Sequence, residues 1–189
     1  MIDRAMEVAA KAHQGQVRKG TDVPYITHPF SVGLILARAG CADEVIAAGI
    51  LHDTVEDTPL TLGEIRDVFG DTVAHIVEGV SEPDKSLPWE DRKRHTINAI
   101  AGASLDVLLV LSADKLHNVR TIASEYRRCG DEVWGRFKRG REAQAWYYSS
   151  IADGLSRRPD IMRYRHLVEA YMQEVTNLFG SRSGSNGTK

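Results

Sequence analysis

Apolar residues recur at helical spacing through almost the whole chain, and this pattern limits the possible folds more than any other feature. In residues 2–13, Ile2, Met6 and Ala9 follow one another about one helical turn apart, and the pattern stops at Gly15. The run 108–111 resembles a buried strand, but the residues around it continue at helical spacing. The sequence therefore predicts an all-α fold, a compact bundle with helical segments at about 2–13, 29–40, 43–57, 61–70, 71–80, 89 onward, 105–128, 131–155 and 159–179.

Capping residues and loops separate these segments. Capping signals stand at Pro29 preceded by Thr27 or His28, at Thr61 followed by Glu64, and at Asp71. Loops are expected at residues 15–27 and 81–88, where the helical period is lost. The tail 181–189 has nothing to bury, so we expect it to be disordered.

Composition excludes several classes of protein. The length of 189 residues fits one domain, and 24 Lys and Arg against 26 Asp and Glu give a net charge of −2, which predicts no nucleic-acid or membrane partner. No apolar run approaches the roughly 20 residues of a membrane span, and residues 1–4 do not open a signal peptide, so we expect a cytoplasmic protein. Cys41 and Cys129 are too few and too far apart for a disulfide scaffold or a cysteine zinc site.

A histidine and a carboxylate end an otherwise apolar helix. His52-Asp53 follow the apolar residues 45–51, and burying this pair requires either a hydrogen-bond network or a metal ion. In a continuous helix the pair and the following acids, Glu56-Asp57, fall within roughly 140° of one face. Carboxylates this close repel one another, and a divalent cation would make the arrangement favourable. The alternative is a solvated acidic helix end.

Two further residues complete a candidate ligand set. His28 stands at the start of a helix, and Asp114 follows the apolar run 107–111. Alone, His28 is more typical of a cap or a core hydrogen-bond partner, and Asp114 of a surface residue. With His52-Asp53 they supply two imidazoles and two carboxylates, a set that suits Mn²⁺, Fe²⁺ or Zn²⁺ and leaves positions for water and substrate.

The order His28, His52-Asp53, Asp114 resembles the signature of the HD superfamily of metal-dependent phosphohydrolases. Over about residues 3–155, the chain is similar to the hydrolase domain of RelA/SpoT proteins, on the motifs 12–19, 24–29, 51–58 and 113–120. Without synthetase and regulatory domains, it resembles the single-domain small alarmone hydrolases, the group of the metazoan SpoT homologue. The resemblance implies a single HD-type domain over residues 1–180.

The resemblance also implies an activity. Members of this group use Mn²⁺ to remove the 3′-pyrophosphate of guanosine tetra- and pentaphosphate (ppGpp and pppGpp), which yields GDP or GTP and pyrophosphate. By resemblance the metal ligands are His28, His52, Asp53 and Asp114, and another divalent cation is compatible with them. Glu56 and Asp57 match the catalytic acids of the family, and a carboxylate one turn beyond a ligand can reach water beside the metal.

Substrate contacts are expected from the residues Arg18, Lys19, Asn118 and Tyr147. Arg18 and Lys19 lie in the loop before His28, where their charges suit phosphate oxygens. Asn118 shares the helical face of Asp114, whereas Arg120 points away from it. For Tyr147 a core aromatic is an equally good interpretation. Lys85 and residues 92–94 are typical of a solvated basic face, and the loop 81–84 departs from the threonine-lysine pattern of the long enzymes.

Other functions remain open from the sequence. The substrate could be an adenosine analogue of the alarmones (ppApp type) or the 2′-phosphate of NADPH. An alternative of another functional class is a non-catalytic nucleotide-sensing module. A protein that only binds a nucleotide has no need of the pair Glu56-Asp57, which argues against this alternative. The sequence leaves the base, the native metal and the oligomeric state open, and residues 156–189 are uninformative.

Overall fold

The computed structural model describes residues 1–82 and 84–180, which form helices joined by loops. Its helices are α1 Ile2–Ala12, α2 Thr27–Arg38, α3 Asp43–Leu51, α4 Thr54–Asp57, α5 Leu62–Phe69, α6 Asp71–Val80, α7 Trp89–Ala99, α8 Leu105–Cys129, α9 Gly140–Ser156 and α10 Arg165–Phe179, with 3₁₀ helices at Gly130–Arg136 and Pro159–Tyr164. Within these residues the one extended pairing is an isolated antiparallel bridge between Val17 and Pro24. The predicted all-α class is confirmed.

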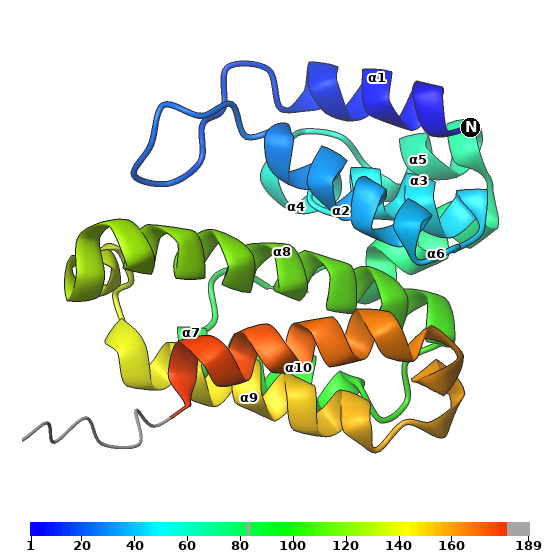
Figure 1. Ribbon diagram of the computed structural model, residues 1–189. Helices are drawn as coiled ribbons and strands as arrows, with labels where there is room; N and C mark the ends of the chain where they lie inside the picture. The colour runs from blue at the N-terminus through cyan, green and yellow to red at the C-terminus, as the bar shows by residue number, and fades with distance from the viewer. Residues whose placement is uncertain (83, 181–189) are drawn as a thin grey trace, which may run out of the picture.

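The long helix α8 runs between two groups of helices (Figure 1). One group, α1 to α6, lies on one side of α8, and α9 and α10 lie on the other. The run 107–111 is buried at every position because α8 is covered on both sides. This run is helical, as its flanking spacing predicts.

Helices α2 and α3 pack closely at glycines. A side chain at Gly33 would meet Ile50 at 2.6 Å, and one at Gly49 would overlap Leu36, so both positions need the smallest residue. This close packing brings the start of α2 to the end of α3, which are the positions of His28 and His52.

The capping predictions have different outcomes. Thr61 and Glu64 form the predicted capping box. The expectation that Asp71 caps α6 is wrong: Gly70, with a φ of 88°, occupies the capping position and Asp71 is the first helical residue. Helix α2 begins at Thr27 rather than Pro29, and the side chain of the residue before it makes no cap.

Three predicted helical segments are interrupted. The segment 43–57 breaks after Leu51, where the Thr54 hydroxyl bonds the Leu51 carbonyl at 2.7 Å, and a short α4 follows. The segment 131–155 is a 3₁₀ helix followed by α9, because Gly140 with a φ of 66° redirects the chain. In the segment 159–179, Pro159 opens a 3₁₀ turn before α10.

Other expectations concern burial and the chain end. Cys41 is buried and Cys129 is half-buried, and both are free thiols. Among the described helices, none combines the length and apolar character needed to cross a membrane. The tail 181–189, predicted to be disordered, lies outside the described residues.

Candidate metal centre and acidic pair

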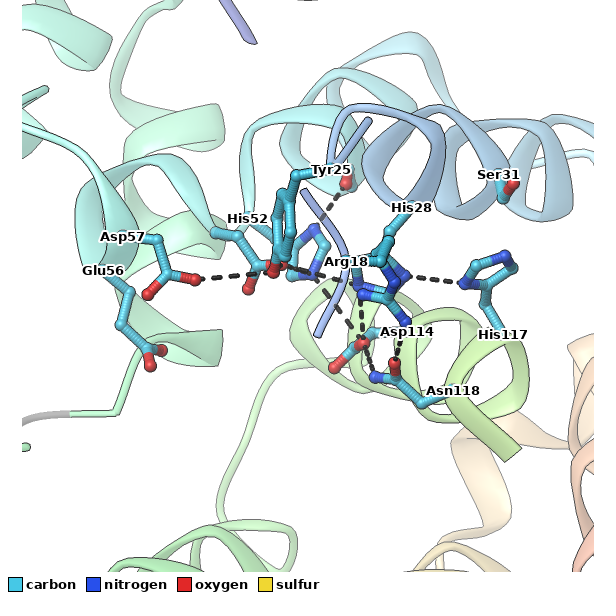
Figure 2. A network of polar contacts seen from close by, with 12 residues as sticks. Arg18, Tyr25, His28, Ser31, His52, Glu56, Asp57, Asp114, His117 and Asn118 are labelled. Carbon is cyan, nitrogen blue, oxygen red and sulfur yellow. Dashed lines mark hydrogen bonds and ion pairs between the residues drawn. The ribbon is translucent and has the colours of Figure 1, made fainter. Parts of the chain in front are cut away.

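The four predicted metal ligands converge at one point, and Figure 2 labels three of them, His28, His52 and Asp114. Ligand atoms of His28, His52 and Asp114 all lie within 4.8 Å of one another. Oδ1 of Asp114 is 3.2 Å from Nε2 of His28 and 3.8 Å from Nε2 of His52. Oδ2 of Asp53 is 3.5 Å and 3.1 Å from the same two nitrogens. Neighbouring ligands of an ion with bonds of about 2.1 Å at right angles are about 3 Å apart, so the donors are already close to the spacing that one cation requires.

The hydrogen bonds of His52 favour a metal ligand. Its Nδ1 lies 2.8 Å from the Gly49 carbonyl, which can only accept, so Nδ1 carries a proton and Nε2 is the ring atom that faces the carboxylates. This Nε2 is buried and has no hydrogen-bond partner in the described part of the chain. Burial disfavours the imidazolium, but the Asp53 carboxylate outweighs it and raises the pKa of His52 to about 9. A second proton or a cation must therefore balance the carboxylates, and the residues present fit a cation.

The carboxylates of the cluster are held ionised by their neighbours. Burial would raise the pKa of Asp53, but His52 lowers it well below its usual range. Asp114 is likewise buried, and the Lys115 ammonium, 2.6 Å from its Oδ2, holds the pKa of Asp114 low. Asp114 thus presents one oxygen to the imidazoles and the other to Lys115. This arrangement favours monodentate binding of a metal by Asp114.

His28 is oriented by a second histidine. Its Nδ1 lies 2.7 Å from Nδ1 of His117, one turn beyond Asp114 on α8. Burial, together with the charges of His28 and Arg18, lowers the pKa of His117 to about 4, so this ring is neutral near pH 7. A neutral partner at Nδ1 leaves Nε2 of His28 facing the carboxylates.

The predicted acidic pair lies beside this cluster but not on an unbroken helix, as the sequence interpretation assumed. The Tyr25 hydroxyl donates to Oδ2 of Asp53 at 2.6 Å and lies 3.4 Å from Oδ2 of Asp57. On the other side, Gln16 donates to the Asp57 carbonyl at 2.9 Å. Tyr25 therefore joins a proposed metal ligand to a proposed catalytic acid across the break between α3 and α4.

The basic residues that the sequence assigned to a solvated face are instead paired. Lys85 forms ion pairs with Asp57 and, at 3.3 Å, with Glu56. Arg92 and Lys93 both pair with Glu82, whose carboxylate is nearly buried. The interpretation as a solvated basic face is wrong for Arg92 and Lys93, which are half-buried against Glu82. Lys85 is exposed, as predicted, but it also pairs with the acids because the loop before α7 folds back onto them.

A cavity of about 390 Å³ adjoins the cluster and is lined by Arg18, Lys19, Tyr25, His117 and Asn118, among others. Asn118 donates to Oδ1 of Asp114 at 2.5 Å, and Arg18 donates to the Asn118 oxygen at 3.1 Å. The predicted substrate residues Arg18, Lys19 and Asn118 are thus brought together. Arg120 pairs with Glu174 instead, consistent with its predicted direction.

Tyr147 is placed differently from these three. It is buried, with its ring 4.8 Å from the Lys93 ammonium, and the neighbouring Tyr148 lines the cavity. A substrate contact by Tyr147 stays a prediction.

Sequence reasoning missed three polar residues of the site. Tyr25 and His117 stand inside motifs that the resemblance singled out, each three residues from a predicted ligand, so their positions relative to His28 and Asp114 were an available signal. Lys85 stands in the stretch 84–88, which is similar to the single-domain group, but it was assigned to a solvated basic face because it reaches Asp57 from 28 residues away.

Comparisons with known proteins agree with this geometry. A family model described as "HD domain" matches residues 5–142. The guanosine-3′,5′-bis(diphosphate) 3′-pyrophosphohydrolase MESH1 of Danio rerio is 43% identical over 150 residues, which cover 78% of this chain and 79% of the relative. The GTP pyrophosphokinase of Streptomyces coelicolor is 44% identical over 124 residues, and the match spans 64% of this chain but 14% of that relative.

A solved structure of a metazoan SpoT orthologue, described as hydrolysing ppGpp, has a TM-score of 0.76 at 28% identity, with 93% of both chains covered. The similarity to RelA/SpoT hydrolase domains that the motifs indicate is therefore confirmed, and it extends over most of the fold.

Proposed function

Because this chain belongs to the HD-domain family, we propose that it is a metal-dependent hydrolase that removes the 3′-pyrophosphate of ppGpp and pppGpp. The observation that carries the proposal is the histidine and carboxylate cluster, with an acidic pair on one side and a cavity with cationic side chains on the other. The similarity to a 3′-pyrophosphohydrolase over about four fifths of that relative's length supports the substrate class. A cytoplasmic location is part of the same proposal.

His28, His52, Asp53 and Asp114 would hold the cation, for which we propose Mn²⁺, because a mixed nitrogen and oxygen set suits first-row divalent metals. When bound, the cation would acidify water and neutralise charge on the attacked phosphate.

Glu56 and Asp57 would carry the proton transfers. Water oxygen bonds to the phosphorus attached to O3′, the P–O3′ bond breaks, and pyrophosphate and a nucleotide with a free 3′-hydroxyl are released. An ionised carboxylate beside the cluster can accept the proton of water and return it to O3′. Tyr25 and Lys85 hold the two oxygens of Asp57, which orients this carboxylate.

The cavity residues would bind the remaining phosphates. Arg18 and Lys19 both line the cavity, and a guanidinium can bind two phosphate oxygens at once. The Arg18–Asn118–Asp114 chain of hydrogen bonds links this phosphate site to the metal centre. Tyr147 is proposed as a further substrate contact, beside the Lys93 and Lys115 ammoniums that lie over its ring.

The experiment is product analysis by mass spectrometry. The protein is incubated with Mn²⁺ and with ppGpp, ppApp or NADPH in parallel, and we expect GDP and pyrophosphate from ppGpp. Glu56→Gln is the inactive control, with a loss on the order of 10²-fold in rate and unchanged metal content. Faster turnover of ppApp or NADPH would reassign the substrate. No turnover of any of them by the metal-loaded protein would refute the hydrolase and favour a sensor.

A further inference from the structure

Lys85 lies between the two acids that the proposed function assigns to proton transfer. Its ammonium pairs with Oδ1 of Asp57 and lies 3.3 Å from Oε1 of Glu56. The side chain is 46% exposed, so it reaches the acids from the solvent side of the site. The inference that follows rests on the proposed function, because it concerns the same acids.

The loop that carries Lys85 is built onto the same acids. The backbone N–H of Glu82 donates to Oε2 of Glu56 at 3.2 Å. The Glu82 carboxylate in turn pairs with Arg92 and Lys93 on α7, in a setting where all three side chains are at most 20% exposed. The start of the loop is therefore anchored to α7, and the loop presents one N–H and one ammonium to the acidic pair.

Repulsion explains why the acids need this support. Asp53, Glu56 and Asp57 lie within five residues, and like charges this close disfavour one another. Tyr25 holds one side of Asp57, and Lys85 is the group that touches both Asp57 and Glu56.

We propose that Lys85 is a positioning residue, which holds Glu56 and Asp57 in the orientation that proton transfer requires and offsets their mutual repulsion. A half-exposed ion pair contributes little to folding, so its removal acts on the geometry of the acids and not on stability. A small misplacement of a reacting group can reduce the rate by up to about 10²-fold. Removing the Lys85 ammonium should therefore lower kcat rather than raise KM.

The kinetic test compares Lys85→Met with Lys85→Arg and with Arg94→Met, an exposed cation on α7 that serves as the matched control. We expect Lys85→Met to lower kcat about tenfold or more, with metal content and Tm unchanged, and Lys85→Arg to recover part of the loss. Arg94→Met should behave as wild type. An unchanged kcat in Lys85→Met overturns the inference, and so does an effect confined to KM, which would make Lys85 a substrate contact.

A second measurement does not depend on turnover. Amine-reactive labelling followed by peptide mass spectrometry compares Lys85 with the exposed Lys138. Lys85 should react more slowly in the wild type and several-fold faster in the double variant Glu56→Gln/Asp57→Asn, whereas Lys138 should not change. Equal labelling of Lys85 in both proteins overturns the inference. A wild type that hydrolyses no nucleotide refutes the proposed function alone, because the labelling result still decides whether Lys85 is held by the acids.

Discussion

Gly49 offers a test of how packing between α2 and α3 supports the metal centre. In Gly49→Ala the new methyl would overlap the Cδ1 of Leu36 and lie 3.3 Å from Val32, and both of these side chains are fully buried. Because neither can move into solvent, we expect an overpacking cost of about 2–3 kcal/mol, in the upper part of the usual range. Alanine recovers up to about 1 kcal/mol of helix propensity, so the net loss should be about 1–2 kcal/mol.

Thermal unfolding followed by circular dichroism measures this loss. For a chain of this length about 1–2 kcal/mol corresponds to a decrease in Tm of about 2–8 °C. Gly63→Ala on α5 is the matched control, since the new methyl would lie 3.8 Å from Thr61 Oγ1, an ordinary van der Waals contact. It should be neutral or stabilising by up to about 1 kcal/mol. Metal affinity should also fall in Gly49→Ala, because separating α2 from α3 separates His28 from His52. A Gly49→Ala variant that melts at or above the wild-type Tm would refute the packing argument.

Three further changes test other parts of the site. His52→Ala should abolish stoichiometric metal binding, because the site loses one of its nitrogen donors. Elemental analysis measures this, and a variant that keeps its metal would show that His52 has only a structural role. Arg18→Ala should raise KM by one to two powers of ten, because a charged phosphate contact of about 1.5–3 kcal/mol is lost, and it should leave the metal content unchanged. If steady-state kinetics show a normal KM, Arg18 does not bind phosphate. Burial opposes the charge of Glu82, but Lys93 and Arg92 lower the pKa of Glu82 in the folded protein below its ordinary 4.5. The ionised Glu82 therefore stabilises the fold above about pH 4.5, and this stabilisation is lost as the pH falls through the pKa of the folded protein. Urea unfolding should therefore show that Glu82→Gln is less stable at pH 7 and loses less stability on acidification, and parallel pH curves would contradict this.

The all-α class and the candidate metal ligands could be predicted from the sequence, because both are indicated by local sequence patterns. The spacing around residues 108–111 outweighs their strand-like composition, and the capping box of Thr61 and Glu64 lies within four residues. The His52-Asp53 pair at the end of an apolar helix indicates a charge that needs a partner, whatever the rest of the fold.

The ends of the helices were harder to predict, because the contacts that end a helix are made with residues outside that helix. The break after Leu51 and the turn at Gly140 interrupt segments whose apolar spacing continues across them. Helical spacing records which residues face the core, and a short 3₁₀ turn or a change of direction can keep the same residues buried.

The arrangement of the site depends on tertiary structure. Tyr25 joins Asp53 to Asp57 across 28 and 32 residues, and Arg18 meets Asn118 across 100 residues. The sequence determined which chemical groups are available and which helices carry them, because periodicity and capping act within a few residues. Which tyrosine, histidine and lysine complete the site was decided only when packing brought distant helices and the loop before α7 together, since a hydrogen bond or ion pair exists only at contact distance and local sequence does not encode that distance.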